Sequence, residues 1–320
     1  MKIKKAIFIL MALVFIIPFL LISAEFILKF VGLGEPILYD TNLSYRYYPK
    51  PNQKIKRFNS NININNFSLR SNEDWDEYST KKKILFYGDS VTYGGSYLNN
   101  RDLFTSIICD KLNNNQKLST CGNAGVNGYG SENIRNRIIY GDIKNENIMV
   151  VTLIGGSGFR SLVNIGSTPT FNEMPTYFPA ITEFVYWGLW KVMLKLRRND
   201  WWFEGRFDQN YLVAKNSLKN LRDTLNVISN KKILIILHPN IEQFDKIDNS
   251  NKKNLQIKYD LLKEIFLDDK NNFEVINIED HLDNKDLDNI YYDGVHLNAN
   301  GHKFFAQIIY KKINQMLVNN

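Results

Sequence analysis

The sequence predicts an α/β protein with three layers, α/β/α, in which helices cover both faces of a doubly wound, five-stranded parallel sheet. Apolar runs without polar alternation are typical of strands buried on both faces. Such runs occupy residues 84–87, 148–154, 233–237 and 273–278, and a further short strand is expected around residues 118–121. Apolar residues at three- and four-residue spacing indicate helices at residues 103–112, 132–140, 212–228, 255–266 and 299–317. Because strands and helices alternate, we expect right-handed βαβ units and a parallel sheet.

The composition places the chain among folded proteins, since 44% of its 320 residues are hydrophobic and 13% are aromatic. The net charge is +7, but the basic residues come as scattered pairs and triplets, such as residues 81–83, 231–232 and 252–253. That scatter argues against nucleic acid as a partner. It fits a solvated surface that faces anionic membranes or glycans.

The N-terminal segment predicts a membrane anchor over residues 1–30. Three lysines among the first five residues precede an uncharged run, residues 6–24, that is long enough to cross a hydrocarbon core of about 30 Å. Lysines before such a run favour a cytoplasmic N-terminus, so the rest of the chain is expected on the periplasmic or extracellular side. Cleavage of a signal peptide after Ala24 is the alternative. We favour a retained anchor because the apolar character continues past Glu25.

The next segment, residues 31–80, is polar and rich in asparagine, and we interpret it as a β extension or linker. Within it, residues 61–65 alternate strictly between Asn and Ile, which predicts a half-buried strand in a small hairpin. The apolar runs of the sheet begin after residue 81, so residues 81–320 are assigned to the α/β domain.

Cys109 and Cys121 are the two cysteines of the chain. In an exported domain they can form a disulfide, and closing so short a loop would stabilise the fold by about 3 kcal/mol in the chain-entropy model. Two buried free thiols on adjacent elements are an equally good interpretation. The sequence leaves both open.

Residues 168–207 interrupt the alternation of strands and helices. The segment is too long for an ordinary connection, so we interpret it as an inserted subdomain or lid. It combines aromatic residues with Lys191, Lys195, Arg197 and Arg198. The aromatic residues are Phe171, Tyr177, Phe178, Phe184, Tyr186, Trp187, Trp190, Trp201, Trp202 and Phe203. We expect them to pack the insertion onto the core; aromatic platforms for a sugar or acyl chain, or a basic face on the membrane, are the alternatives.

Ser90 follows the first strand of the predicted sheet directly, in the stretch Gly88-Asp89-Ser90. In a doubly wound sheet the ligand site lies beyond the carboxyl ends of the strands. A helix that begins just after Ser90 would direct the hydroxyl into the cleft, with backbone N–H groups facing a developing oxyanion. Taken alone, Gly-Asp-Ser is also typical of a turn or cap without chemistry.

Asp293 and His296 follow the fifth strand, just before a helix that is expected to start near Asn298. Their spacing lets the carboxylate accept from one imidazole nitrogen while the other nitrogen stays free to take a proton. For either residue alone, a turn, a cap or a surface role is the simpler interpretation. Because the same sheet edge also presents Ser90, the three residues predict a catalytic triad.

At these residues the chain resembles the SGNH, or GDSL-type, hydrolases, a family named for blocks that hold a Ser, a Gly, an Asn and a His. "GDSVTYG" at residues 88–94 resembles the first block, and "DGVHLNANGH" at residues 293–302 resembles the last. "CGNAGVNGYG" at residues 121–130 resembles the second. The resemblance runs from about residue 81 to 317 and implies a flavodoxin-like sheet. The preceding "PKPNQ" and "NNFSLRSNED" resemble the β extension of membrane-anchored, glycan-associated members.

The third block departs from the family. Where members have Gly-x-Asn-Asp after the third strand, this chain has "GGSG" at residues 155–158. Ser157 stands at the position of the asparagine whose amide donates to the oxyanion, and losing one such donor costs about 10²–10³ in rate. Gly128 is the counterpart of the family glycine whose N–H lines the oxyanion hole. The resemblance therefore implies an oxyanion hole formed by Ser90 and Gly128, with help from Ser157.

The resemblance implies an exported serine esterase or O-acyltransferase that acts on O-acyl groups, acetyl being favoured, of a cell-envelope or extracellular polysaccharide. Ser90 would be the nucleophile, His296 the base and Asp293 the residue that orients the imidazole. The expected partners are an acylated glycan or small ester and, through the N-terminal helix, the membrane; no cofactor is expected, and the oligomeric state is open. The alternative is a catalytically weak or inactive glycan-binding or assembly protein of a polysaccharide-modification system.

Two rival interpretations of these residues are rejected. A GxSxG nucleophile elbow would need Gly where Thr92 stands, and its acid usually lies well before the histidine. A metal site is also not expected, because the Asp-x-x-His pair is explained by the triad. The residues that such a metal site would use are His281, Asp293, His296 and His302. His238, at the end of the fourth strand, is interpreted as a structural histidine, with a substrate contact as the alternative.

Overall fold

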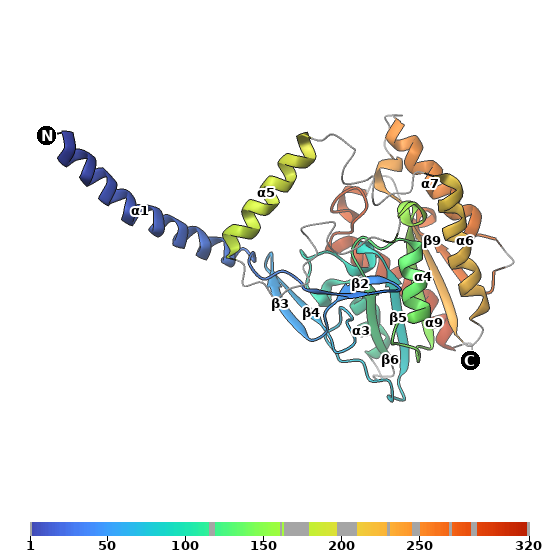
Figure 1. Ribbon diagram of the computed structural model, residues 1–320. Coiled ribbons are helices and arrows are strands. Elements are labelled where there is room, and N and C mark those ends of the chain that lie inside the picture. The colour runs from blue at the N-terminus through green and yellow to red at the C-terminus, as the bar shows by residue number, and fades with distance from the viewer. Residues whose placement is uncertain are drawn as a thin grey trace.

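The computed structural model describes residues 2–114, 119–160, 162, 179–196, 210–228, 231–244, 250–268, 271–282 and 287–318. At its centre lies a parallel sheet of five strands in the order β6-β5-β7-β8-β9 (Figure 1). The strands are β5 (Lys82–Gly88), β6 (Ser119–Gly125), β7 (Ile148–Ile154), β8 (Lys232–His238) and β9 (Glu274–Asn277). With helices on both faces, this arrangement confirms the predicted three-layer, doubly wound α/β/α fold.

The α-helices that surround the sheet are α2 (Ser90–Tyr93), α3 (Phe104–Asn113), α4 (Ser131–Tyr140), α6 (Tyr211–Val227), α7 (Ser250–Phe266), α8 (Leu287–Ile290) and α9 (Ala299–Val318). Helix α2 begins at Ser90, next to the predicted start, and α3, α4, α6, α7 and α9 match predicted segments to within about five residues, whereas α8 has no counterpart among the predictions. Short 3-10 helices are η1 (Asn100–Asp102), η2 (Gly155–Phe159), η4 (Ile241–Phe244) and η5 (Ile278–His281). Side chains of β5 alternate between the two faces and are buried on both. Leu85 and Tyr87 pack with α4, α6 and α7, while Ile84 and Phe86 pack with α3 and α9.

Two antiparallel hairpins precede the sheet. They are formed by β1 (Tyr39–Asn42) with β2 (Arg46–Pro49), and by β3 (Gln53–Arg57) with β4 (Ser60–Ile64). In β4, Ser60, Ile62 and Ile64 are buried whereas Asn61 is exposed, which confirms the half-buried strand that the Asn-Ile alternation predicts. The division of the chain near residues 30 and 80 stays a prediction.

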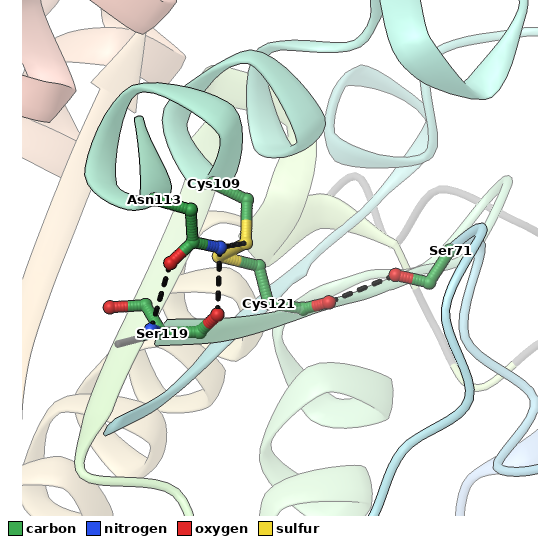
Figure 2. Close-up of a disulfide and its surroundings, with 5 residues drawn as sticks. All are labelled: Ser71, Cys109, Asn113, Ser119 and Cys121. Carbon is green, nitrogen blue, oxygen red and sulfur yellow. Dashed lines mark hydrogen bonds between the residues drawn. A yellow bond between two sulfur atoms is a disulfide. The ribbon is translucent and has the colours of Figure 1, made fainter. Parts of the chain in front are cut away.

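A disulfide joins Cys109 on α3 to Cys121 on β6, so the sequence alternative of two free thiols is wrong (Figure 2). The Asn113 amide supports the bridge, because it donates to the Ser119 carbonyl at 2.8 Å and accepts from the Ser119 N–H at 2.9 Å. The Ser71 hydroxyl donates to the Cys121 carbonyl at 2.9 Å. The bridge therefore lies where a helix, a strand edge and the segment before the sheet meet.

Two helices stand apart from this body: α1 (Lys2–Phe30) and α5 (Ala180–Leu196), which leave the molecule at the same corner (Figure 1). The 20-residue stretch Met11–Phe30 of α1 has a mean hydropathy of 2.5, and none of it is buried. It is long and apolar enough to cross a membrane or to act as a signal sequence.

Helix α5 is the described part of the predicted insertion at residues 168–207. The expectation that its aromatic residues pack onto the core is wrong for Phe184 and Tyr186, whose side chains are 57% and 56% exposed. The side chains of Trp190, Lys191 and Lys195 on α5 lie outside the described part of the structure, so the predictions for them stay untested. The same holds for the predictions at Phe171, Tyr177, Phe178, Arg197, Arg198, Trp201, Trp202 and Phe203, which lie outside the described residues.

Candidate active site

The nucleophile candidate Ser90 is the first residue of α2, at the carboxyl end of β5. The fully buried Asp89 caps this short helix, because its Oδ1 accepts from the Val91 N–H at 2.9 Å. The helix ends at Gly94, whose φ of 91° lies in the left-handed region that favours glycine. A Cβ at Gly94 would also lie 2.3 Å from Leu103 Cδ2. This sequence therefore allows a single tight turn that leaves Ser90 partly exposed.

The structure brings Ser90, His296 and Asp293 together in one chain of hydrogen bonds. His296 Nε2 lies 2.8 Å from Ser90 Oγ. His296 Nδ1 lies 2.8 Å from Asp293 Oδ2 and 3.0 Å from its Oδ1. With Nδ1–H donating to the carboxylate, Nε2 is the imidazole lone pair that faces the hydroxyl. The geometry is that of a nucleophile, a base and a group that orients the base.

Asp293 is held as a carboxylate. Its partial burial opposes ionisation, but the side chain and backbone N–H of His296 and the backbone N–H of Val295 donate to it and lower its pKa to about 2. An ionised carboxylate fixes the imidazole tautomer and stabilises the imidazolium that forms when His296 takes a proton.

The second loop of the site follows β6. Gly125 at the end of that strand permits close contact with α2, because a Cβ there would lie 2.4 Å from the Tyr93 backbone nitrogen. Gly128 follows with a φ of 81°, again in the left-handed region, and is partly exposed. This backbone conformation sets the direction of the Gly128 N–H, the predicted oxyanion donor.

Ser157, in contrast, lies inside its own turn. It belongs to η2, it is fully buried, and its Oγ accepts from the Ile154 N–H at 3.0 Å. The hydroxyl therefore satisfies the backbone at the end of β7 and does not line a surface that a substrate can contact. The predicted help of Ser157 to an oxyanion finds no support in these contacts.

Arg160 is the polar residue at this edge that the sequence reasoning missed. One of its terminal nitrogens, Nη1, donates to Asp89 Oδ2 at 3.0 Å and to the Tyr129 carbonyl at 2.9 Å. The Arg160 side chain is 14% exposed and the Asp89 side chain 0%. This arginine thus joins three loops: the nucleophile turn, the loop of Gly128, and its own loop after β7. The signal in the sequence is a lone arginine directly after "GGSGF".

A stacked pair of tyrosines joins the nucleophile loop to the histidine loop. The rings of Tyr97 and Tyr292 lie 4.0 Å apart with an interplanar angle of 15°, and the Tyr97 hydroxyl donates to the Leu297 carbonyl at 3.0 Å. Arg70, fully buried, supports the loop from below by donating to the carbonyls of Tyr93 and Leu98. These contacts fix the relative position of Ser90 and His296, which are 206 residues apart in the chain.

The remaining histidines of the sheet edge are structural. His238 is fully buried, with Nε2 2.7 Å from the Val295 carbonyl oxygen, so the alternative of a substrate contact is wrong. His302 is also fully buried, and its Nδ1 accepts from the Phe104 N–H at 3.1 Å. Within the described ranges, no group of three or more His, Cys, Asp and Glu side chains is arranged to hold a metal ion.

No known family profile matches this sequence, and no curated protein matches it. Solved structures that are similar include an acetyl xylan esterase, at 16% identity and a TM-score of 0.47, over 72% of this chain and 99% of the other. A lipase/acylhydrolase from Enterococcus faecalis is 14% identical with a TM-score of 0.46, over 73% and 96%. An acetylxylan esterase from Geobacillus stearothermophilus is 14% identical with a TM-score of 0.44, over 74% and 96%.

Proposed function

We propose that this protein is a serine esterase or O-acyltransferase that acts on O-acyl groups, acetyl in the first instance, of a cell-envelope or extracellular polysaccharide. The observation that carries the proposal is the hydrogen-bonded chain from Ser90 through His296 to Asp293 at the carboxyl edge of the sheet. Helix α1 would hold the protein on the membrane, with the α/β domain on the periplasmic or extracellular side.

In the first half-reaction Ser90 Oγ attacks the ester carbonyl carbon while its proton passes to His296 Nε2. The N–H groups of Ser90 and Gly128 would donate to the oxyanion of the tetrahedral intermediate. The imidazolium then gives its proton to the leaving sugar oxygen as the carbon–oxygen bond breaks, which leaves an acyl-Ser90. Water or an acceptor hydroxyl, deprotonated by His296, attacks this acyl group and regenerates Ser90.

Arg160 follows the altered third block and connects the loops of the proposed oxyanion hole. Through Asp89 and the Tyr129 carbonyl it holds the Gly128 loop against the nucleophile turn. The donor lost with the family asparagine is not restored by this contact, but the position of the two remaining backbone donors is fixed. We therefore assign Arg160 as a positioning residue.

A glycan-binding protein without turnover is the second candidate. It is favoured by one observation: Ser157 is fully buried within its own turn, which leaves the proposed oxyanion hole one side-chain donor short.

The test uses the full chain in detergent or nanodiscs. We expect hydrolysis of a small acetyl ester, such as 4-nitrophenyl acetate, and labelling by a fluorophosphonate, both lost in Ser90→Ala. Ser79→Ala, in the segment before β5, is the matched control and should keep both. Labelling of Ser90 without hydrolysis of the small ester would indicate a strict requirement for a particular substrate or acyl acceptor. Acetylated glycans would then be screened. Polysaccharide binding without labelling would establish the second candidate in place of the first.

A further inference from the structure

Helix α5 presents an apolar surface to solvent over its described length. Phe184, Val185, Tyr186, Leu189 and Val192 are each about half exposed, from 48% to 59%. The helix of 17 residues carries only three charged residues, Glu183 and the two lysines at positions 191 and 195. Several large apolar side chains exposed side by side along one helix normally mark a contact with protein or lipid. We therefore expect a partner to cover this surface of α5.

The first turn of α5 is fixed to the end of α1. Both carboxylate oxygens of Glu25 accept from the start of α5, Oε1 from the Ala180 N–H at 2.8 Å and Oε2 from the Ile181 N–H at 3.0 Å. This satisfies two N–H groups that have no partner within the helix, and it places a negative charge at the positive end of the helix dipole. Glu25 is the acidic residue within helix α1. Its contacts with the start of α5 give this charge a structural role.

A second carboxylate fixes the same turn to the β extension. Glu183 Oε2 accepts from the Gly34 N–H at 2.6 Å, and Glu183 Oε1 accepts from Arg57 Nη2 at 2.6 Å. The two side chains of this ion pair are only 7% and 11% exposed. Truncating one partner of a buried pair leaves an uncompensated charge and is strongly destabilising. We call Glu25, Gly34, Arg57 and Glu183 the junction.

The exposed apolar surface continues from α1 across the junction to α5. On α1, Phe26, Ile27 and Phe30 are 70%, 64% and 88% exposed, and α5 packs against this helix. In Figure 1 α1 extends away from the α/β domain, and α5 rises from the same corner in a different direction. If α1 enters a bilayer, α5 starts at the level where α1 leaves it.

The length of α5 and the route of the chain exclude a second crossing. Seventeen residues span about 25 Å, which is less than the roughly 30 Å of a hydrocarbon core. The next described helix, α6, packs on the sheet through Leu218 and Leu221, so the chain must return to the α/β domain. The intervening residues 197–209 include six charged residues in the sequence and are too polar to recross lipid.

We propose that α5 inserts its apolar residues into the half of the bilayer nearer the α/β domain, as a second, non-spanning contact with the membrane that α1 enters. The partner is the phospholipid surface. The inference rests on the proposed role of α1 as a retained anchor. With two contacts joined by the junction, the α/β domain is held in one orientation over the membrane.

The test places an environment-sensitive NBD label at single introduced cysteines of the full chain in vesicles of phosphatidylcholine and phosphatidylglycerol. The α5 variants are Leu189→Cys and Phe184→Cys. Val14→Cys on α1 reports on the anchor, and Val227→Cys at the end of α6, 81% exposed, is the aqueous control. We expect the α5 labels to shift to shorter emission wavelengths, to lose quenching by iodide and to be quenched by doxyl-labelled lipid, as the α1 label is. Fluorophosphonate labelling of each variant verifies the fold at Ser90.

Iodide quenching of the α5 labels equal to that at residue 227, with residue 14 quenched by doxyl lipid, would overturn the inference and leave the anchor intact. Protection from iodide without quenching by doxyl lipid would also overturn it, because a protein surface such as a second copy would then cover α5. Absence of doxyl quenching at residue 14 would reject the anchor and the inference together, whatever the esterase assay shows.

Discussion

The two sides of the candidate site differ in how they are built. On the proton-transfer side, Ser90, His296 and Asp293 meet at 2.8 Å each, as their motifs predict. On the proposed oxyanion side, Ser157 is fully buried and accepts from the Ile154 N–H, and Arg160 joins the loops instead. The difference indicates that the proposed proton transfer would depend on three side chains with fixed spacing. The proposed oxyanion hole would instead rest on backbone donors, whose loops Arg160 connects.

Removing the charge on the proton-transfer side should have the largest effect. In Asp293→Asn the imidazole loses its ionised partner and its fixed tautomer, so we expect kcat to fall by about 10⁴-fold. The matched control is Asp288→Asn on the nearby exposed surface of α8, which should stay near the native rate. Ester hydrolysis measured for both proteins checks this. Equal rates in the two variants would reject the triad.

Removing Arg160 should affect both activity and stability. Arg160→Met leaves the fully buried Asp89 without its ion-pair partner, and we expect a loss of about 3–5 kcal/mol in the free energy of unfolding. The double variant Asp89→Asn/Arg160→Gln removes both charges and should recover most of that stability. Its kcat should stay about 10²-fold low with little change in KM, because displaced loops misplace the oxyanion donors. A native kcat in the folded double variant would show that Arg160 has only a structural role.

Removing the disulfide should change stability alone. Cys109→Ser/Cys121→Ser opens a loop with a sequence separation of 12 residues, which corresponds to about 3 kcal/mol. We expect a lower midpoint of urea unfolding and an unchanged kcat below that midpoint, since the bridge lies on α3 and β6 away from the hydroxyl of Ser90. A loss of kcat in the folded double variant would contradict this separation of the two regions.

Acid should weaken the fold through the two buried histidines. Burial lowers the pKa of His238 to about 4 and that of His302 to about 3, from 6.5. Between pH 6.5 and 4 the unfolded chain binds protons that the folded chain excludes, so stability decreases as the pH falls, by up to about 1.4 kcal/mol per pH unit for each histidine. Urea unfolding of His302→Gln across this range should show the smaller slope. An unchanged slope would mean that His302 is protonated in the folded protein.

The smallest effect is expected at Ser157. Ser157→Ala removes one hydrogen bond to the end of β7, which costs about 1 kcal/mol of stability. We expect a rate within about two-fold of the native one, since a single neutral contact outside the cleft contributes little to the transition state. A fall of about 10²–10³ would instead show that the hydroxyl donates to the oxyanion. The rate of ester hydrolysis is measured for Ser157→Ala, Ser157→Asn and the native protein. The Asn variant shows how much a side-chain amide at this position raises the rate.

The fold was predictable where strands are uniformly apolar. Residues 148–154 match β7 fully because every residue of that strand is buried and hydrophobic or Thr. The sequence underestimated β6, Ser119–Gly125, because its buried residues are small or polar. The polar ones satisfy their groups through tertiary contacts, as the Asn123 amide does by donating to the Thr92 carbonyl. The meeting of Ser90, His296 and Asp293 was predictable from motif spacing. Arg160 was not, because its partners Asp89 and Tyr129 come from two other loops.

The junction also limits how far the α/β domain, and Ser90 with it, can move relative to α1. Only eight residues separate the end of α1 at Phe30 from the start of β1 at Tyr39, and a free linker of that length would let the domain move over roughly 15 Å. Glu25 of α1 accepts from the start of α5, and Glu183 of α5 forms an ion pair with Arg57, so that freedom is removed. The distance between Ser90 and the end of α1 is then set by the fold. If α1 anchors the protein as proposed, the distance from the membrane at which Ser90 can act is fixed as well, and does not vary with the motion of a linker.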